Sequence, residues 1–201
     1  MPFTPFHMGP GIAIKAVLQG SFSLMVFGWA QIVMDLQPLF VMITGEGHLH
    51  GFSHTYAGAT LLALFSALTG KYLSEIGLFF LGLNRQWQVR IAWWVTIVSA
   101  FIGTYTHVLL DSIMHHDVEL FFPLTTMNPF QGFISIASLH NICIYSGMAG
   151  GVVYFAILAV RKFNNSKRQD PAAGAPEFDS YPLKIVSFTH RSPVFMRVSA
   201  F

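Results

Sequence analysis

The sequence predicts an all-α, polytopic membrane protein, a helical bundle of about three to four spans followed by an irregular C-terminal tail. Hydrophobic residues make up 53% of the 201 residues and charged residues only 10%, whereas soluble domains contain about 25% charged residues. Several apolar segments also reach the roughly 20 residues that a membrane-spanning helix needs. The net charge of +2 is too small for a nucleic-acid footprint, so the expected partner is the lipid bilayer and no nucleic acid.

Four apolar segments are candidate spans. Residues 91–114 and 133–160 each predict one helix, and residues 55–83 predict either one long kinked helix or two packed pieces. The segment 11–34 has two readings. It is either a single span or a re-entrant helical hairpin that turns near residues 19–21, since Gly and Ser favour turns and halves of 10 to 14 residues are too short to cross.

Basic residues predict the orientation of the bundle. The connection at 84–90 contains two arginines, and Arg161 and Lys162 follow the last apolar segment. Because cytoplasmic loops are enriched in Lys and Arg, we expect this connection and the tail in the cytoplasm. The connections at 35–54 and 114–132 are then expected on the opposite side.

Composition also predicts the domain boundary. We expect a membrane bundle over residues 1–163, which contains the candidate site, and a cytoplasmic linker and tail over residues 164–201. The first part of that tail is rich in Asn, Ser, Pro, Ala and Asp, which is typical of disordered linkers.

The most informative residues are histidines and aspartates near the outer ends of the predicted helices. His107, Asp111 and His115 follow one another at four-residue steps, which places them on one face of a helix. An Asp at bilayer depth costs roughly 2.5–3.5 kcal/mol and normally faces a partner or a cavity. Imidazole and carboxylate are the usual ligands of catalytic zinc, so this pattern predicts a metal site. The alternative is a hydrogen-bonded His107–Asp111 pair that holds helices together.

The first outer connection supplies further candidates. Asp35 is expected to act as a metal ligand or base across from His54, or else to begin a turn before Pro38. His48 and His50 are expected either as additional ligands or as ordinary loop histidines.

Four short motifs occur in an order that resembles a known family. They are Met1-Pro2-Phe3-Thr4-Pro5-Phe6-His7, Asp35-Leu36-Gln37, Gly51-Phe52-Ser53-His54-Thr55 and Thr106-His107-Val108-Leu109-Leu110-Asp111. Together they resemble the YdjM-like inner-membrane proteins, which are described as membrane-bound metal-dependent hydrolases. That family is similar in turn to zinc-dependent phospholipase C and the single-strand-specific zinc nucleases.

The resemblance implies a ligand set and bears on the first apolar segment. It implies that His7, Asp35, His54, His107 and Asp111 are metal ligands, with His115 or His116 as a further ligand. If His7 and Asp35 share a site, segment 11–34 must be a hairpin, because a straight span would separate them by more than about 30 Å. If the segment spans instead, His7 is cytoplasmic and is not a ligand.

We therefore expect a zinc-dependent hydrolase in the bacterial inner membrane, with its site on the non-cytoplasmic side. The expected substrate is a phosphoester such as a phospholipid or lipid-linked phosphate, with Asp35 and Asp111 as catalytic residues and an undetermined number of Zn²⁺ ions. One alternative is a haem- or pigment-binding protein that uses His54, His107 and His140 as axial ligands. Another is a non-catalytic subunit of a larger membrane complex.

Overall fold

The computed structural model describes residues 5–82 and 90–169, and these residues form helices and connections without a strand. This confirms the all-α prediction. Single 3₁₀ turns precede α1 and α3 and link α1 to α2. The five α-helices are α1 (Met8–Leu18), α2 (Leu24–Thr44), α3 (Tyr56–Phe80), α4 (Trp93–Met114) and α5 (Ile136–Gln169).

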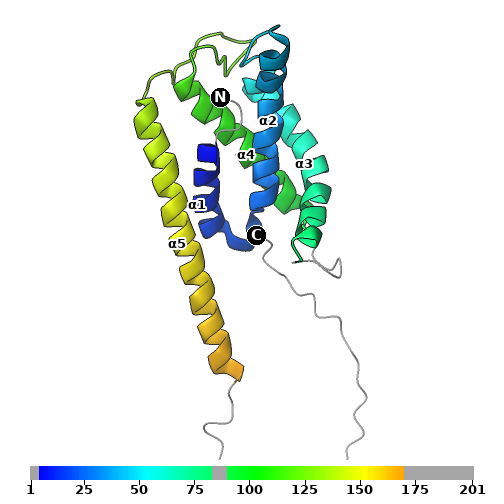
Figure 1. Ribbon diagram of the computed structural model, residues 1–201, viewed down its shortest axis with the longest axis vertical. Helices are drawn as coiled ribbons and strands as arrows, with labels where there is room; N and C mark the ends of the chain where they lie inside the picture. Colours follow the sequence, from blue (N-terminus) through cyan, green and yellow to red (C-terminus); the bar gives the residue numbers. More distant parts are fainter. Residues whose placement is uncertain (1–4, 83–89, 170–201) are drawn as a thin grey trace, which may run out of the picture.

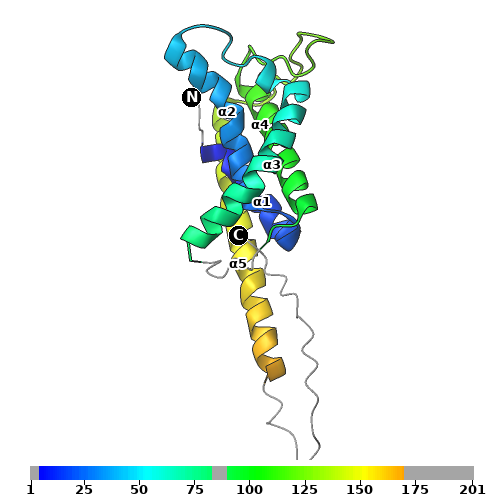
Figure 2. The same ribbon diagram turned by 90° about the vertical axis from the view of Figure 1, so that its right-hand side faces the viewer.

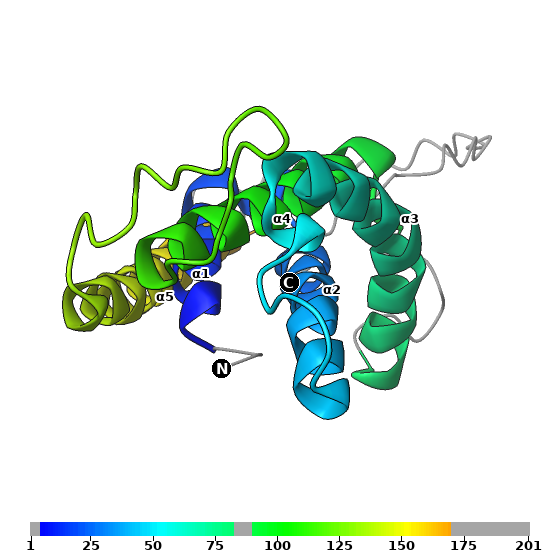
Figure 3. The same ribbon diagram turned by 90° about the horizontal axis from the view of Figure 1, so that it is seen from above.

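The helices pack as a bundle in which α2, α3 and α4 contact one another and α1 and α5 form a second, adjoining pair (Figure 1). Viewed at 90°, α1 begins partway along the bundle and ends near the turn from which α2 starts (Figure 2). The connections α2–α3 and α4–α5 lie at one end of the bundle, and α5 extends past the other helices at the opposite end. From above, α5 and α1 lie to one side of α4 while α2 and α3 lie to the other (Figure 3).

Four helices, α2 to α5, are long and apolar enough to cross a membrane. The outward-facing surface is correspondingly apolar, whereas a soluble protein rarely exposes a large continuous apolar area. Large exposed side chains occur on each of these helices, including Phe40, Ile43, Leu61, Phe80 and Phe155. The chain therefore has the architecture of a multi-pass membrane protein.

The first apolar segment is a hairpin, as one of its two readings predicted. Its turn lies at Gln19–Ser21, where Lys15 Nζ donates to the carbonyl oxygens of Gln19 and Phe22 at 2.9 and 2.8 Å. The expected length of the second half was wrong, because α2 contains 21 residues. Pro38 lies inside this helix, so Asp35 is a helical residue and does not begin a turn.

The single-helix alternative for segment 55–83 is confirmed for its described residues, which form α3 (Tyr56–Phe80) with Lys71 and Glu75 paired at 2.6 Å inside it. Two other boundaries differ from the predictions. Helix α4 ends at Met114, so His115 is not on the helical face shared by His107 and Asp111. Helix α5 continues to Gln169, six residues into the segment expected as a linker. Most of the connection at 84–90 and the tail from residue 170 lie outside the described residues.

Small residues bring α1 and α5 into close contact. A Cβ atom added at Gly9 would lie 1.9 Å from the carbonyl oxygen of Cys143, and one added at Gly150 would lie 2.5 Å from Cα of Ala13. Small residues at such positions allow helix backbones to approach closely within a membrane. This contact holds α1, and with it His7, against the rest of the molecule.

Candidate metal centre

Five of the six predicted ligands converge inside the bundle. Asp111 Oδ2 lies 3.2 Å from Nε2 of both His54 and His107, and Asp111 Oδ1 lies 3.5 Å from Nε2 of His7. His107 Nε2 also lies 3.5 Å from Asp35 Oδ1. All five side chains are buried, with His54 and His107 at 0% exposure. They come from the turn before α1, the middle of α2, the turn before α3 and the end of α4.

Close packing of α2 on α4 places His107 at this point. A Cβ atom at Gly103 would lie 2.8 Å from Cβ of Ala30, so a larger residue would separate the two helices. The contact allows Gln31 Nε2 to donate to the carbonyl oxygen of Gly103 at 3.1 Å. Gln31 Oε1 then faces His107 Nδ1 at 2.6 Å, and because an amide oxygen only accepts, Nδ1 carries the proton.

The Ser-His-Thr motif positions the second histidine. Thr55 Oγ1 accepts a hydrogen bond from the N–H of Gly58 and thereby caps α3. Ser53 Oγ lies 2.8 Å from His54 Nδ1, which turns Nε2 towards the aspartates. Position 58 has room only for glycine, because a Cβ atom there would overlap the carbonyl oxygen of Phe52 in the turn that precedes α3. Each residue of the motif therefore fixes His54 or the helix that follows it.

The inward-facing ring nitrogens lack hydrogen bonds within the described residues. Nε2 of His7, His54 and His107 is buried in each case without a hydrogen-bond partner, although carboxylate oxygens lie 3.2–3.5 Å away. Nδ1 of His107 donates to Gln31, so its Nε2 faces Asp111 Oδ2 either as a lone pair or as the N–H of an imidazolium. A cation between the two atoms, a metal ion or that proton, removes the repulsion of facing lone pairs, and buried polar atoms without partners are costly.

The chemistry of the donor set fits a divalent metal ion. Combinations such as His7–His107–Asp111 and Asp35–His54–His107 each bring three ligand atoms within 4.8 Å of one another. His and Asp are borderline and hard ligands of the kind that zinc accepts. The two carboxylates also balance the charge of one divalent cation. The hydrogen bond that His107 Nδ1 donates to Gln31 Oε1 is of the kind that metal-binding histidines ordinarily make with their second ring nitrogen.

Two of the histidines are held in the form that binds metal. Burial, together with the neighbouring His107, lowers the pKa of His7 from 6.5 to about 4. Burial also lowers the pKa of His54, against the opposing effect of Asp111. Both imidazoles are therefore neutral at pH 7, and a neutral imidazole is the form that coordinates metals.

A cavity of about 390 Å³ connects this cluster with the loop-bearing end of the bundle. Its walls contain a second group, His50, His115 and Asp117, whose ligand atoms also lie within 4.8 Å of one another. Both oxygens of Asp117 lie 2.9 Å from His50 Nδ1, and the rings of His50 and His115 stack at 4.2 Å. Among the described residues that line the cavity there is no Lys or Arg, so these side chains provide no fixed positive charge for an anion.

The structure thus groups most, but not all, of the predicted ligands. It separates His115 from the buried five and places it in the second group, while His116 only lines the cavity wall. His50 belongs to the second group and is not an isolated loop histidine. His140 stacks on Phe6 at 4.4 Å. The rings of His54 and His107 are 5.3 Å apart, which leaves no room for a tetrapyrrole between them.

The sequence patterns place Asp117 near the other outer acids and histidines but do not predict its pairing with His50, and they do not assign Gln31 and Gln37 a supporting role. Gln31 offered a signal, because a glutamine within an apolar segment needs a polar partner at bilayer depth. Gln37 belongs to the Asp35-Leu36-Gln37 motif. Here it braces the α2–α3 connection, with Oε1 accepting from the N–H of Ser53 and Nε2 donating to the carbonyl of His48.

Comparisons with protein-family models, curated proteins and solved structures found no match to this chain.

Proposed function

We propose that the protein is a membrane-embedded, metal-dependent hydrolase that binds Zn²⁺ at the buried His/Asp cluster. The observation that carries this proposal is the convergence of three unpartnered Nε2 atoms and two carboxylates at one buried point. A structural His–Asp network would instead pair each buried nitrogen with an acceptor in hydrogen-bond geometry. The cavity above the cluster supports a reaction site, because it gives a substrate and water access to the ligands.

The proposed reaction is hydrolysis of a phosphoester in a phospholipid or lipid-linked phosphate. When bound, zinc supplies a water nucleophile at neutral pH and positive charge for a phosphoryl group. Asp35 lines the cavity and is the residue placed to orient the water or accept its proton. Gln31 Oε1 accepts the hydrogen bond from Nδ1 of His107 and so already fixes the tautomer of this histidine. Asp111 is therefore proposed as a metal ligand and not as the residue that fixes the tautomer. The lack of Lys and Arg in the described cavity wall supports a metal as the source of positive charge.

We place the site on the non-cytoplasmic side of a bacterial inner membrane. His54 directly precedes α3 and Asp111 lies in the last turn of α4, towards the end of the bundle that carries the α2–α3 and α4–α5 connections, while Asp35 lies in the middle of α2. Arg90 lies three residues before α4 begins, and Arg161 and Lys162 lie in the last third of α5, the part of α5 that points away from the α2–α3 and α4–α5 connections (Figure 1). The enrichment of basic residues in cytoplasmic loops supports this orientation.

The proposal is tested by hydrolysis of phospholipids and chromogenic phosphodiesters with the full chain in detergent micelles. We expect activity that disappears with a chelator, returns with Zn²⁺ and is lost in Asp35→Asn. A protein that binds zinc stoichiometrically but hydrolyses none of these esters would contradict the hydrolase assignment. His140→Gln is the matched control, since His140 lies outside the groups of potential ligands.

A further inference from the structure

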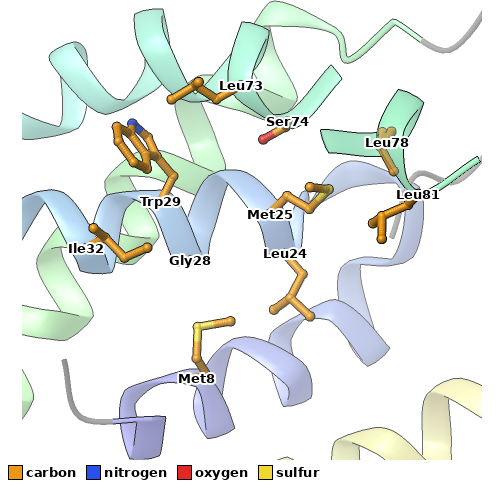
Figure 4. Close-up of a pocket in the computed structure, with 10 residues that line it drawn as sticks. All are labelled: Met8, Leu24, Met25, Gly28, Trp29, Ile32, Leu73, Ser74, Leu78 and Leu81. Atoms are coloured by element: carbon orange, nitrogen blue, oxygen red, sulfur yellow. The ribbon is translucent and has the colours of Figure 1, made fainter. Parts of the chain in front are cut away.

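A second, apolar groove lies in the part of the bundle where α2, which also carries Asp35 of the cluster, packs against its neighbours. It has a volume of about 500 Å³ and lies among α1, α2 and α3, with walls that include Met8, Met25, Gly28, Trp29, Ile32 and Leu78 (Figure 4). Ser74 is the one polar side chain among the ten described residues that line it. An apolar groove of this kind accepts hydrocarbon and not a polar substrate group.

One end of the groove is lined by residues that lie within one helical turn, along the chain, of two residues of the candidate metal centre. Met8 is the residue next to His7, and Ile32 precedes Asp35 by three positions on α2, which places both on one helix face. From Ile32 the groove follows α2 back to Leu24, a distance of about 12 Å at 1.5 Å per residue.

The groove opens towards the lipid. Ile32, Leu73 and Leu81 on its walls are 42%, 44% and 67% exposed, and α2 and α3 are both long enough to span the membrane. The molecules that meet such an opening within a bilayer are lipid chains. Its walls are fixed, because Trp29 Nε1 donates to Thr69 Oγ1 at 2.8 Å, and Gly28 provides the space, since an added Cβ would meet only Met8 within 4 Å.

We propose that this groove holds one acyl chain of a phospholipid whose phosphate group reaches the His/Asp cluster. The inference rests on the proposed function and specifies how its substrate is bound. The chain lies along α2 with its polar end at Met8 and Ile32, beside His7 and Asp35. The groove thereby selects esters that carry a long hydrocarbon chain and aligns the phosphate with the cavity.

The test is photolabelling of the full chain in phosphatidylcholine nanodiscs doped with a phospholipid that carries a diazirine on one acyl chain. We expect adducts on Met25 and Trp29 in clear excess over those on Val152, which is 71% exposed on α5 and reports contact with bulk lipid. Gly28→Leu fills the groove and should reduce the adducts on Trp29 about tenfold, because excluding two methylenes at about 0.8 kcal/mol each already corresponds to that factor.

Gly151→Leu is the matched control, because a Cβ atom there meets nothing within 4 Å; its labelling should equal that of the unmodified chain. Ile32→Trp is a second variant for the case that Gly28→Leu does not fold. It also narrows the groove, and because Ile32 is only half-buried, the larger side chain can be accommodated. Labelling of Trp29 no higher than that of Val152, or unchanged in both groove variants, would overturn the inference. If unlabelled polyprenyl phosphate suppressed the labelling of Trp29 and unlabelled phospholipid did not, the acyl-chain inference would also be overturned, in favour of an isoprenoid chain.

Metal content measured on the same samples separates this inference from the proposed function. Gly28→Leu should retain metal, because Gly28 contributes no ligand. Bound metal without groove labelling would refute the acyl-chain site alone. Groove labelling in a protein without metal would refute the hydrolase and leave a lipid-binding groove.

Discussion

Replacing Gln31 with Met should weaken metal binding without removing a ligand. Gln31 Oε1 lies 2.6 Å from His107 Nδ1 and the side chain is only 6% exposed, so water does not replace the lost acceptor. The carbonyl of Gly103, which Gln31 also contacts, keeps a hydrogen bond from Thr106 Oγ1 at 3.1 Å. The principal loss is therefore the contact that fixes the tautomer and orientation of His107.

Loss of such an outer-shell contact typically reduces metal affinity about 10–100-fold, which corresponds to about 1.4–2.7 kcal/mol. We expect a loss within this range when the apo protein in detergent competes for zinc with a chromophoric chelator. Thr104→Val is the control, since Thr104 is buried one turn from His107 and bonds only weakly to Phe101 O at 3.4 Å. Equal affinity in Gln31→Met and the unmodified chain, or an equal loss in Thr104→Val, would refute the reasoning.

Three further predictions concern stability. Glu75→Gln should lower the unfolding free energy in SDS by about 3–5 kcal/mol, because it leaves buried Lys71 without its carboxylate partner at 2.6 Å; a loss below 1 kcal/mol contradicts this. Gly9→Leu should lower the thermal unfolding temperature and reduce α1–α5 cross-linking, since even a Cβ atom overlaps the carbonyl of Cys143, and an unchanged temperature contradicts it. Because the pKa of His7 falls from 6.5 to about 4 on folding, the unfolded chain binds more protons in this interval. The unfolding free energy of apo protein should therefore decrease as the pH falls from 6.5 towards 4, with a smaller decrease in His7→Gln; an identical pH dependence in both contradicts it.

Local sequence patterns predicted the helices well but not every helix end. Apolar length alone identifies α4 and α5, because a span requires about 20 apolar residues whatever it packs against, whereas it left α3 as either one helix or two pieces. Helix α2 was cut short at Asp35, since Pro38 and a carboxylate both argue against a helix interior in water. Within a membrane-spanning bundle, neighbouring helices tolerate a proline, and Asp35 faces His107.

The site was predictable where its residues share a helix or a motif. His107 and Asp111 are four residues apart on α4, and the Ser-His-Thr element caps α3. The pairing of His50 with Asp117 joins residues 67 positions apart, and no local pattern reports such a contact. The separation of His115 from the cluster depends on α4 ending at Met114, a boundary that four-residue spacing could not supply.

We propose that the buried His/Asp cluster holds a metal ion, and the zinc content of the full chain decides this. It is measured by mass spectrometry on protein purified in detergent, beside His107→Gln and the control His140→Gln. We expect at least one zinc per chain in the unmodified protein and in His140→Gln, and a loss of zinc in His107→Gln. Absence of stoichiometric metal from the unmodified protein, or full retention in His107→Gln, would contradict it.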